Sequence, residues 1–353
     1  MAKKKKSFII KFLIWVLAFL VLSAGIIGYL GYKSFFAPNI SIANQKSKVI
    51  FIPTGSNFEE VVTILAKENI LINKTSFTLT AKLKKYNLSI KPGRYRILAN
   101  SNNNKIINLL RSGKQEPITI TFSNLRTKKE FVTRICKRIE ADSLELMALL
   151  NNDPYLKNNF GMGSEKIMTL FIPNTYEFKW NTSSQQFMER MKKEYNLFWT
   201  KEKLNKAKAI HLTPVEVAIL ASIVQCEQQQ FADERPIIAQ LYLNRLKAGI
   251  PLQSDPTVIY ALGDFTITRV LDIDKRTNSP YNTYLHSGLP PGPIYIPEIS
   301  SINAVLNAKT NKYIYMCAKE DFSGRHNFAS TLAEHTLNAK HYQKALNKQK
   351  IWR

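Results

Sequence analysis

The feature that most constrains this chain is an uncharged, apolar run near its N-terminus, from Phe12 to Tyr32. As a helix, these 21 residues would span about 30 Å, the thickness of the hydrocarbon core of a bilayer. The run is longer than the apolar region of a cleavable signal peptide, which has about 7–15 residues. Lys3–Lys6 and Lys11 precede it, so the positive-inside rule places the N-terminus in the cytoplasm and everything after Lys33 outside. We therefore expect a single-pass membrane anchor.

The charge balance restricts the partners that the chain can have. Lysine and arginine number 50 against 26 aspartates and glutamates, which gives a formal net charge of +24 and favours nucleic acid, anionic lipid or an acidic polymer as partner. The charge is spread along the chain, and no dense basic stripe, zinc-finger or RNA-binding motif is present, so we expect no nucleic-acid binding. Hydrophobic residues make up 45% of the sequence, which excludes wholesale disorder.

The three cysteines, Cys136, Cys226 and Cys317, are far apart and odd in number. They have no metal-ligand spacing and do not form a complete disulfide framework. We expect buried free thiols, and we expect neither a metal site nor a cofactor.

Composition and periodicity divide the chain into an anchor, a stalk and two folded parts. The expected segments are a tail and anchor at 1–34, a stalk at 35–47, a small αβ module at 48–115 and a larger domain at 116–353. Within the module the expected elements are a strand at 49–52, a helix capped by Asn57, a helix at 77–86, a strand at 95–98 and a helix at 104–112.

The larger domain begins with a similar strand–turn–helix pattern. A strand is expected at 118–122, and Thr127 with Glu130 forms a capping box for a helix that runs through Ile139. Residues 141–210 are expected to be mostly helical, apart from an extended loop at 170–176. The pattern as a whole predicts an α+β fold.

A core helix is predicted after Thr213 by three independent rules. Thr213 is a cap, Pro214 occupies the first position, and Glu216 stands three residues after the cap. The residues that follow are apolar on nearly every side of the helix, which is typical of a buried helix.

Glu227 lies near the end of this helix, on the face of Leu220, Ile223 and Val224. Aliphatic neighbours desolvate the charged form of a carboxyl group and raise its pKa, and the negative end of the helix dipole acts in the same direction. A carboxylic acid that stays protonated near neutral pH suits general-acid catalysis at a glycosidic oxygen. The alternative is that a glutamate late in a helix points into water.

Two further features follow the core helix. Asp233 is the expected cap of the next helix, and Asp255 followed by Pro256 is the expected start of another. The segment 279–293 is dense in Pro, Gly, Tyr and Asn, and it predicts a stiff loop whose aromatic and amide groups could bind sugars. A plain surface loop is the alternative.

Several of these segments resemble, in order, the motifs of the YceG-like endolytic murein transglycosylases. The matching segments are Ala221–Glu227, Asn244-Arg245-Leu246, Leu252–Tyr260, Ser279–Tyr284, Gly288–Gly292, His326-Asn327-Phe328 and Glu334-His335. With a LysM-like module at about 48–112 and the N-terminal anchor, the resemblance covers nearly the whole chain. It implies an anchor in the bacterial cytoplasmic membrane with the catalytic domain on the outer side, peptidoglycan strands as substrate, and peptidoglycan synthases as possible partners.

The resemblance also implies which residues act. Glu227 stands at the position of the family's catalytic glutamate, and the positions expected to line the glycan groove are Asn244, Gln253, Asp255, Thr257, Tyr260, Tyr281, Asn282 and Tyr284. The implied reaction is non-hydrolytic. Glu227 protonates the oxygen between N-acetylmuramic acid and N-acetylglucosamine, and then serves as base while the C6 hydroxyl closes on the anomeric carbon to leave a 1,6-anhydro end.

The sequence departs from the family at two positions. Asn174 stands where the family often has an aspartate, so we assign no acid–base role to that loop, and Cys226 stands where a polar or charged residue usually precedes the glutamate. A hydrolase would need a second carboxylate, for which Glu234 and Asp255 are candidates. A non-catalytic glycan-binding scaffold of the elongation machinery is the alternative from another functional class.

Overall fold

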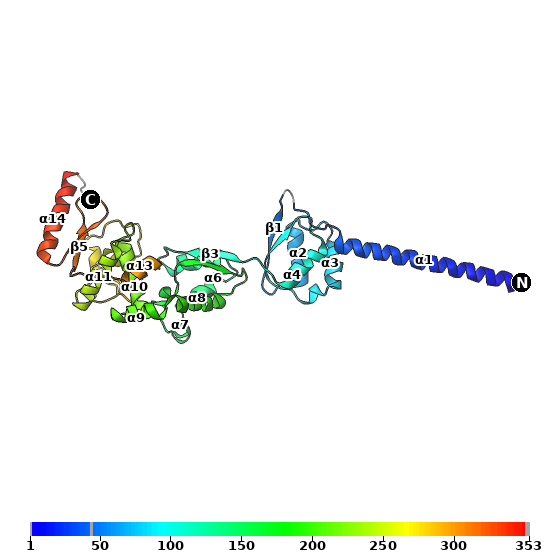
Figure 1. Cartoon of the computed structure of the whole chain (residues 1–353), viewed down its shortest axis with the longest axis horizontal. Helices are drawn as coiled ribbons and strands as arrows, with labels where there is room; N and C mark the ends of the chain where they lie inside the picture. Colours follow the sequence, from blue (N-terminus) through cyan, green and yellow to red (C-terminus); the bar gives the residue numbers. More distant parts are fainter. Residues whose placement is uncertain (1, 43–44, 350–353) are drawn as a thin grey trace. The chain divides into compact units, whose positions relative to one another are not determined.

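The computed structural model describes residues 2–42 and 45–349 (Figure 1). The chain forms two compact units. The first holds the residues up to Ile118 together with Glu177–Asn181, and the second holds Thr119–Tyr176 and the residues from Thr182 onward.

The apolar N-terminal run forms one long helix, α1 (Ala2–Phe36). Its segment Phe8–Phe36 contains an 18-residue window with a mean hydropathy of 2.5 and is long and apolar enough to cross a membrane. Helices α9 (Lys201–Ala209) and α10 (Pro214–Glu227) would together meet the same criterion only as one span bent by 74°. Since α10 is a buried core helix, α1 is the candidate membrane span within the described part of the chain.

The rest of the first unit is a two-stranded antiparallel sheet covered by helices. The elements are β1 (Ser47–Ile52), α2 (Phe58–Lys67), α3 (Lys74–Leu83), a 3₁₀ turn at Tyr86–Leu88, β2 (Gly93–Leu98) and α4 (Asn103–Ser112). Strand β1 pairs with β2 from Ser47 opposite Leu98 to Ile52 opposite Gly93. The predicted cap Asn57 is confirmed, and it forms a capping box with Glu60.

The second helix of this unit differs from the prediction of 77–86. It begins at Lys74, because the side chain of Asn73 accepts a hydrogen bond from the backbone N–H of Ser76 and so caps the helix. It ends at Leu83. Lys85 has a φ of 55°, a left-handed conformation that stops the helix.

The end of α1 is joined to the rest of the first unit by buried polar side chains. The amide of Asn39 donates to Asn103 Oδ1 at 2.7 Å, and the amide of Asn103 donates to the backbone oxygen of Ser34 at 2.8 Å. The hydroxyls of Ser34 and Thr80 are 3.1 Å apart. Asn39, Thr80 and Asn103 are almost fully buried, so these bonds form inside the unit and not on its surface.

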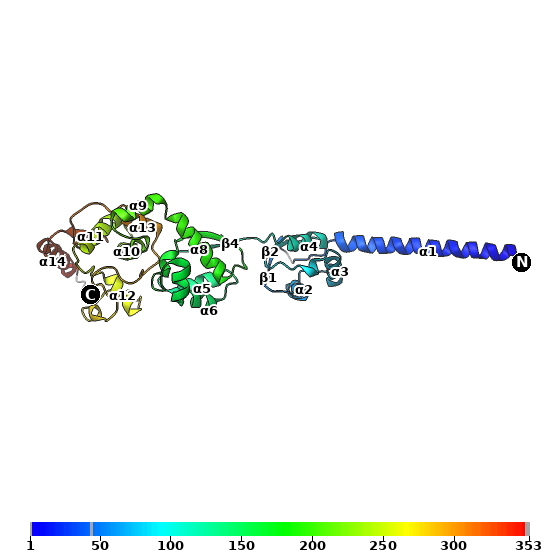
Figure 2. The same ribbon diagram turned by 90° about the horizontal axis from the view of Figure 1, so that it is seen from below.

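The second unit combines two small sheets with many helices, which confirms the predicted α+β character of the chain (Figures 1 and 2). Its first part contains β3 (Ile118–Phe122), α5 (Lys128–Cys136), α6 (Ser143–Asn151), α7 (Asp153–Phe160), a 3₁₀ turn at Ile167–Leu170, β4 (Asn174–Phe178) and α8 (Ser184–Phe198). After α9 and α10 come α11 (Arg235–Lys247), α12 (Asp255–Leu262), a 3₁₀ turn at Asp274–Arg276, α13 (Ile299–Leu306), β5 (Tyr315–Ala318), β6 (His326–Ala329) and α14 (Leu332–Lys348).

Several boundaries in this unit differ from the predictions. The helix that starts after the confirmed capping box of Thr127 and Glu130 ends at Cys136 and does not reach Ile139. The extended segment at 170–176 is in part a strand, because β4 begins at Asn174 and pairs with β3.

The core of the second unit is built around α10, which both views show beside α11 and α13 (Figures 1 and 2). All three predicted start signals are present: the Thr213 cap, Pro214 in the first turn, and the reciprocal bonds with Glu216. Every residue of α10 from Val217 to Gln225 is buried. The predicted core helix is therefore confirmed.

We expect Leu220→Ala to lower the free energy of unfolding by about 2–5 kcal/mol, because it leaves a cavity at a fully buried position of α10. Chemical denaturation of the full chain measures the change. The matched control is Leu144→Ala, whose side chain is 80% exposed and for which we expect a change within about 0.5 kcal/mol. Equal effects of the two substitutions would contradict the assignment of α10 as the core helix.

Candidate active site

Helix α10 ends at Glu227 because the next residue leaves the helical conformation. Gln228 has φ −135° and ψ 93° and is buried. Its side-chain oxygen accepts from the backbone N–H groups of Gln230 and Phe231 at 3.1 and 3.0 Å, and its amide nitrogen donates to Glu234 Oε2 at 2.8 Å and to the oxygen of Gly324 at 3.0 Å. One buried amide therefore stabilises the turn that presents Glu227.

Arg235 closes the same turn from the other side. Its guanidinium donates to the backbone oxygens of Gln228 and Gln229 at 2.8 and 3.1 Å, and so satisfies carbonyl groups at the end of α10. The guanidinium is buried and pairs with the carboxylate of Glu298 at 3.0 Å. A buried cation with this many acceptors fixes the position of α11 relative to α10.

The carboxyl group of Glu227 is half-buried and is held through one oxygen. Oε1 accepts a hydrogen bond from the Tyr242 hydroxyl at 2.7 Å and another from the hydroxyl of Ser254. Burial raises the pKa of Glu227, although the two hydroxyl donors act in the opposite direction; the charge of Asp255 raises this pKa further. The pKa elevation expected from the sequence is thus confirmed in direction and in its main cause.

Glu227 opens into a cavity of about 530 Å³. Its walls come from the ends of α10 and α11, the segment before α12, the β5–β6 hairpin and the start of α14. The lining residues are Glu227, Leu241, Tyr242, Arg245, Leu252, Gln253, Asp255, Tyr284, Tyr315, Met316, Cys317, Ala318, His326, Leu332 and His335.

Two polar pairs shape the walls of this cavity. The hydroxyl of Tyr284 donates to Asp255 Oδ1 at 2.6 Å. Arg245 donates to the backbone oxygens of Pro251 and Ile314 at 2.9 and 2.7 Å and to the side chain of Gln253. Arg245 therefore ties the segment before α12 to the approach to β5.

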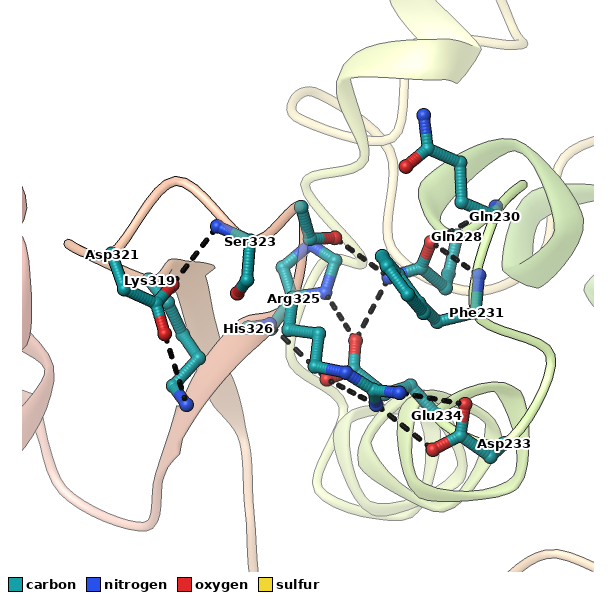
Figure 3. Close-up of polar contacts among 11 residues, drawn as sticks. Gln228, Gln230, Phe231, Asp233, Glu234, Lys319, Asp321, Ser323, Arg325 and His326 are labelled. Atoms are coloured by element: carbon teal, nitrogen blue, oxygen red, sulfur yellow. Dashed lines mark hydrogen bonds and ion pairs between the residues drawn. The ribbon is translucent and has the colours of Figure 1, made fainter.

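A second carboxylate, Glu234, is only 5% exposed and contacts His326 of the cavity wall. It follows the turn at Gln228, and it occupies the N-cap position of α11. His326 Nδ1 lies 3.0 Å from Glu234 Oε2, and the backbone N–H of His326 donates to Glu234 Oε1 at 3.3 Å (Figure 3). Arg325 approaches the same carboxylate at 3.6 Å.

Two predicted helix caps are wrong. Asp233 does not cap α11; it forms an ion pair with Arg325 at 2.8 Å, while Glu234 occupies the N-cap position (Figure 3). Asp255 is the first residue of α12 and not its cap, since the N-cap position belongs to Ser254. The hydroxyl of Ser254 makes no capping bond, because it donates to Glu227 instead.

The residues expected to line a glycan groove fall into three groups. Gln253, Asp255 and Tyr284 line the cavity of Glu227. Tyr260 and Tyr281, whose ring centroids are 4.8 Å apart, line a different cavity of about 410 Å³.

The third group consists of residues whose polar atoms hold the loops around the site. Asn244 donates to the backbone oxygens of Asn311 and Tyr313 at 3.0 and 2.9 Å. Asn282 is fully buried and donates to the oxygens of Lys275 and Thr277, both at 2.9 Å.

Thr257, also in this third group, bonds the oxygen of Ser254 at 2.7 Å and the hydroxyl of Thr283 at 2.8 Å. These bonds fix the backbone next to the Ser254 hydroxyl that reaches Glu227. None of the three residues in this group is among those that line the two cavities described above.

Sequence reasoning did not assign a role to Tyr242, Ser254, Arg245 or His326, which all lie around Glu227. Three of them stand inside or beside the recognised segments: Ser254 beside Asp255, Arg245 within Asn244-Arg245-Leu246, and His326 at the start of His326-Asn327-Phe328. Their position within or beside these segments is the signal from which their role at the site could have been predicted.

Cys226 lies beside Glu227 and is a free thiol, like Cys136 and Cys317. Each of the three thiols is partly buried. Burial raises the pKa of Cys226 to about 12 and that of Cys136 to about 11. A thiol that stays protonated is a poor nucleophile, so the geometry does not favour Cys226 as the reacting group.

The raised pKa of Glu227 makes the stability of the fold depend on pH. A carboxyl group whose pKa is higher in the folded than in the unfolded chain stabilises the fold fully below its unfolded pKa, and it loses this contribution as pH rises through the folded value. We expect Glu227→Gln to gain stability relative to the parent as pH rises above the ordinary glutamate range. Urea unfolding at a series of pH values measures this, and a difference that does not change with pH would contradict it.

The comparisons with known proteins agree with the resemblance noted in the sequence. The YceG-like family matches residues 50–341. The endolytic murein transglycosylase of Bacillus subtilis 168 is 30% identical over 85% of this chain and 86% of its own length, and that of Streptococcus pneumoniae R6 is 27% identical over 97% of this chain. The chain spans 66% of the length of the pneumococcal protein, slightly less than two thirds.

A solved structure shows the same relationship. The crystal structure of a YceG-like protein from Listeria monocytogenes superposes with a TM-score of 0.55 at 25% sequence identity, and it covers 83% of this chain and 98% of that one. The chain belongs to the YceG-like family.

Proposed function

We propose that this protein is a peptidoglycan lytic transglycosylase that cleaves within glycan strands and uses Glu227 as its general acid. The observation that carries the proposal is the environment of one carboxyl group. Burial raises the pKa of Glu227, and Oε1 is occupied by the hydroxyls of Tyr242 and Ser254. The proton is then favoured on Oε2, at the wall of a cavity.

The proposed reaction breaks the bond between C1 of N-acetylmuramic acid and O4 of N-acetylglucosamine. Glu227 donates its proton to O4 as that bond breaks, and this avoids expulsion of an alkoxide. The C6 hydroxyl of the same muramic acid sugar then bonds to C1 and loses its proton to a base, for which the Glu227 carboxylate is one candidate. The product has a 1,6-anhydro end, and no water is consumed.

The cavity offers suitable partners for a sugar chain. Gln253, Asp255 and Tyr284 supply amide, carboxylate and phenol groups beside Glu227. The pair Tyr260 and Tyr281 supplies aromatic surface in the second cavity. We assign glycan contacts to these five residues, and we assign positioning of the loops to Asn244, Thr257 and Asn282 from their internal hydrogen bonds.

A hydrolase would need a second carboxylate free to activate water. Asp255 accepts a hydrogen bond from Tyr284, and Glu234 is buried among Gln228, Arg325 and His326. Both carboxylates are engaged with neighbouring side chains, which favours the intramolecular attack over hydrolysis.

The remaining parts of the proposal concern the location and the partners of the chain. We infer that α1 anchors the protein in the bacterial cytoplasmic membrane and, from Lys3–Lys6 and the positive-inside rule, that residues after Lys33 lie outside. We further propose that residues 48–115 act as a LysM-like glycan-binding module and residues 116–353 as the catalytic domain. Peptidoglycan synthases, which make the nascent strands that such an enzyme would shorten, are the proposed protein partners.

We expect Glu227→Gln to lower the rate of release of 1,6-anhydro products from isolated glycan strands by about 10²–10⁴-fold, the usual contribution of a general acid. The full chain in detergent is the enzyme, and mass spectrometry identifies the products. An anhydro end is one water lighter than a reducing end, so the same measurement separates a transglycosylase from a hydrolase.

The matched control is Glu202→Gln, whose side chain is 75% exposed on α9; we expect it to keep the parental rate. Reducing ends as the main product would overturn the transglycosylase assignment. Parental rates from Glu227→Gln would overturn the assignment of Glu227 as the general acid. A parent protein that binds strands but releases no fragments would support a non-catalytic scaffold instead.

A further inference from the structure

The imidazole of His326 lies at the first residue of β6 and is held by one carboxylate. Its Nδ1 is 3.0 Å from Glu234 Oε2, and its backbone N–H donates to Glu234 Oε1 at 3.3 Å (Figure 3). Since both contacts go to the same buried side chain, the carboxylate fixes the position of the backbone and the orientation of the ring.

Glu234 is suited to act as an acceptor. Its carboxylate also receives a hydrogen bond from the Gln228 amide at 2.8 Å and lies 3.6 Å from Arg325 (Figure 3). An ionised carboxylate only accepts hydrogen bonds, so Nδ1 of His326 carries the proton that faces it. In the neutral imidazole the other ring nitrogen, Nε2, is then the basic one.

Nε2 is available to a substrate. His326 lines the same cavity as Glu227, with a side chain that is 16% exposed. Within the described residues, no hydrogen-bond partner of Nε2 is found, whereas Nδ1 is engaged. The charge of His326 also acts on the carboxyl group of Glu227 and lowers its pKa, which places the two groups within electrostatic reach of each other.

We propose that His326, positioned by Glu234, is the base of this site and takes the proton of the substrate's C6 hydroxyl through Nε2. This inference deepens the proposed transglycosylase function and rests on it. Glu227 then acts as the acid, His326 as the base, and Glu234 as a positioning residue whose negative charge stabilises the imidazolium that forms.

The step balances without any further reactant. The proton of Glu227 moves to O4 as the C1–O4 bond breaks; the C1–O6 bond forms, and the proton of O6 moves to Nε2. The site is left with a carboxylate and an imidazolium, and transfer of one proton between them, directly or through solvent, restores the starting state. Nothing is oxidised or reduced.

A separate base has a physical advantage over a single carboxyl group. If Glu227 acted alone, its carboxylate would have to turn from the departing oxygen to the C6 hydroxyl while two hydroxyl groups hold Oε1. With His326 as base, donation and acceptance of protons take place at two fixed groups. This arrangement suits a reaction in which the C6 hydroxyl must attack before water does.

We expect His326→Ala and His326→Asn to lower kcat for release of anhydro products by about 10²-fold or more, with KM nearly unchanged. The asparagine amide can still donate to Glu234, so this second variant keeps the structural contact and lacks only the basic nitrogen. The acidic limb of the kcat–pH profile should disappear in both variants, and added imidazole should restore activity to His326→Ala. The assay uses the full chain and isolated glycan strands.

Two further variants complete the test. Glu234→Gln keeps an acceptor for Nδ1–H but removes the charge, and we expect about a tenfold loss of kcat with a displaced acidic limb. His341→Ala removes an exposed imidazole of α14 and should leave the rate and the pH profile unchanged.

The outcomes separate the two proposals. Parental kcat in His326→Asn, or an unchanged pH profile together with no rescue by imidazole in His326→Ala, would overturn the assignment of His326 as base. If Glu227→Gln at the same time abolishes anhydro products, the transglycosylase function stands without it. A parent protein that releases no anhydro products would overturn the function itself.

Discussion

The geometry of the site depends on the hydrogen bonds of one buried amide, the side chain of Gln228. It ends α10 directly after Glu227, holds the next two backbone N–H groups, and donates to Glu234. An unbroken helix would carry Glu234 onward along the same cylinder, seven residues beyond Glu227. The turn instead returns the chain, so that Glu234 reaches His326, which lines the cavity of Glu227. Since unsatisfied buried polar groups cost about 1–3 kcal/mol each, the four bonds of this amide hold the turn in a single conformation.

Two carboxyl groups on either side of this turn have different surroundings. Glu227 meets only hydroxyl donors, from Tyr242 and Ser254, and burial raises its pKa. Glu234 meets an amide, an imidazole and a guanidinium. Two glutamates therefore differ in role because their neighbouring side chains differ. Glu227 is suited to donate a proton, and Glu234 is suited to orient the imidazole of His326.

Local signals in the sequence predicted much of this fold. The caps at Asn57, Thr127 and Thr213 were predicted correctly because each capping bond joins residues only three positions apart. The burial of α10 and the raised pKa of Glu227 followed from helical spacing. Helix ends at Leu83 and Cys136 were misplaced, since a left-handed residue or an early turn leaves little trace in hydrophobic periodicity.

The contact of Glu234 with His326 could not be predicted from the sequence, because the two residues lie 92 positions apart along the chain and only the folded hairpin brings them together. The same reason explains the caps that failed. Asp233 has the residue type of a cap, but its tertiary partner Arg325 takes its side chain. Asp255 lies one residue inside α12, and its side chain accepts a hydrogen bond from the distant Tyr284.

The junction of α1 with the first unit has a mechanical consequence. Asn103 bonds the backbone of Ser34 within the last turn of the helix, and Asn39 joins the two through Asn103 and Asn73. If α1 lies in a bilayer, this junction gives torsional stiffness where a flexible tether would allow free rotation. When the membrane helix rotates or tilts, the rest of the first unit then moves with it. That part of the chain keeps a fixed orientation relative to the helix and a fixed height above the lipid surface.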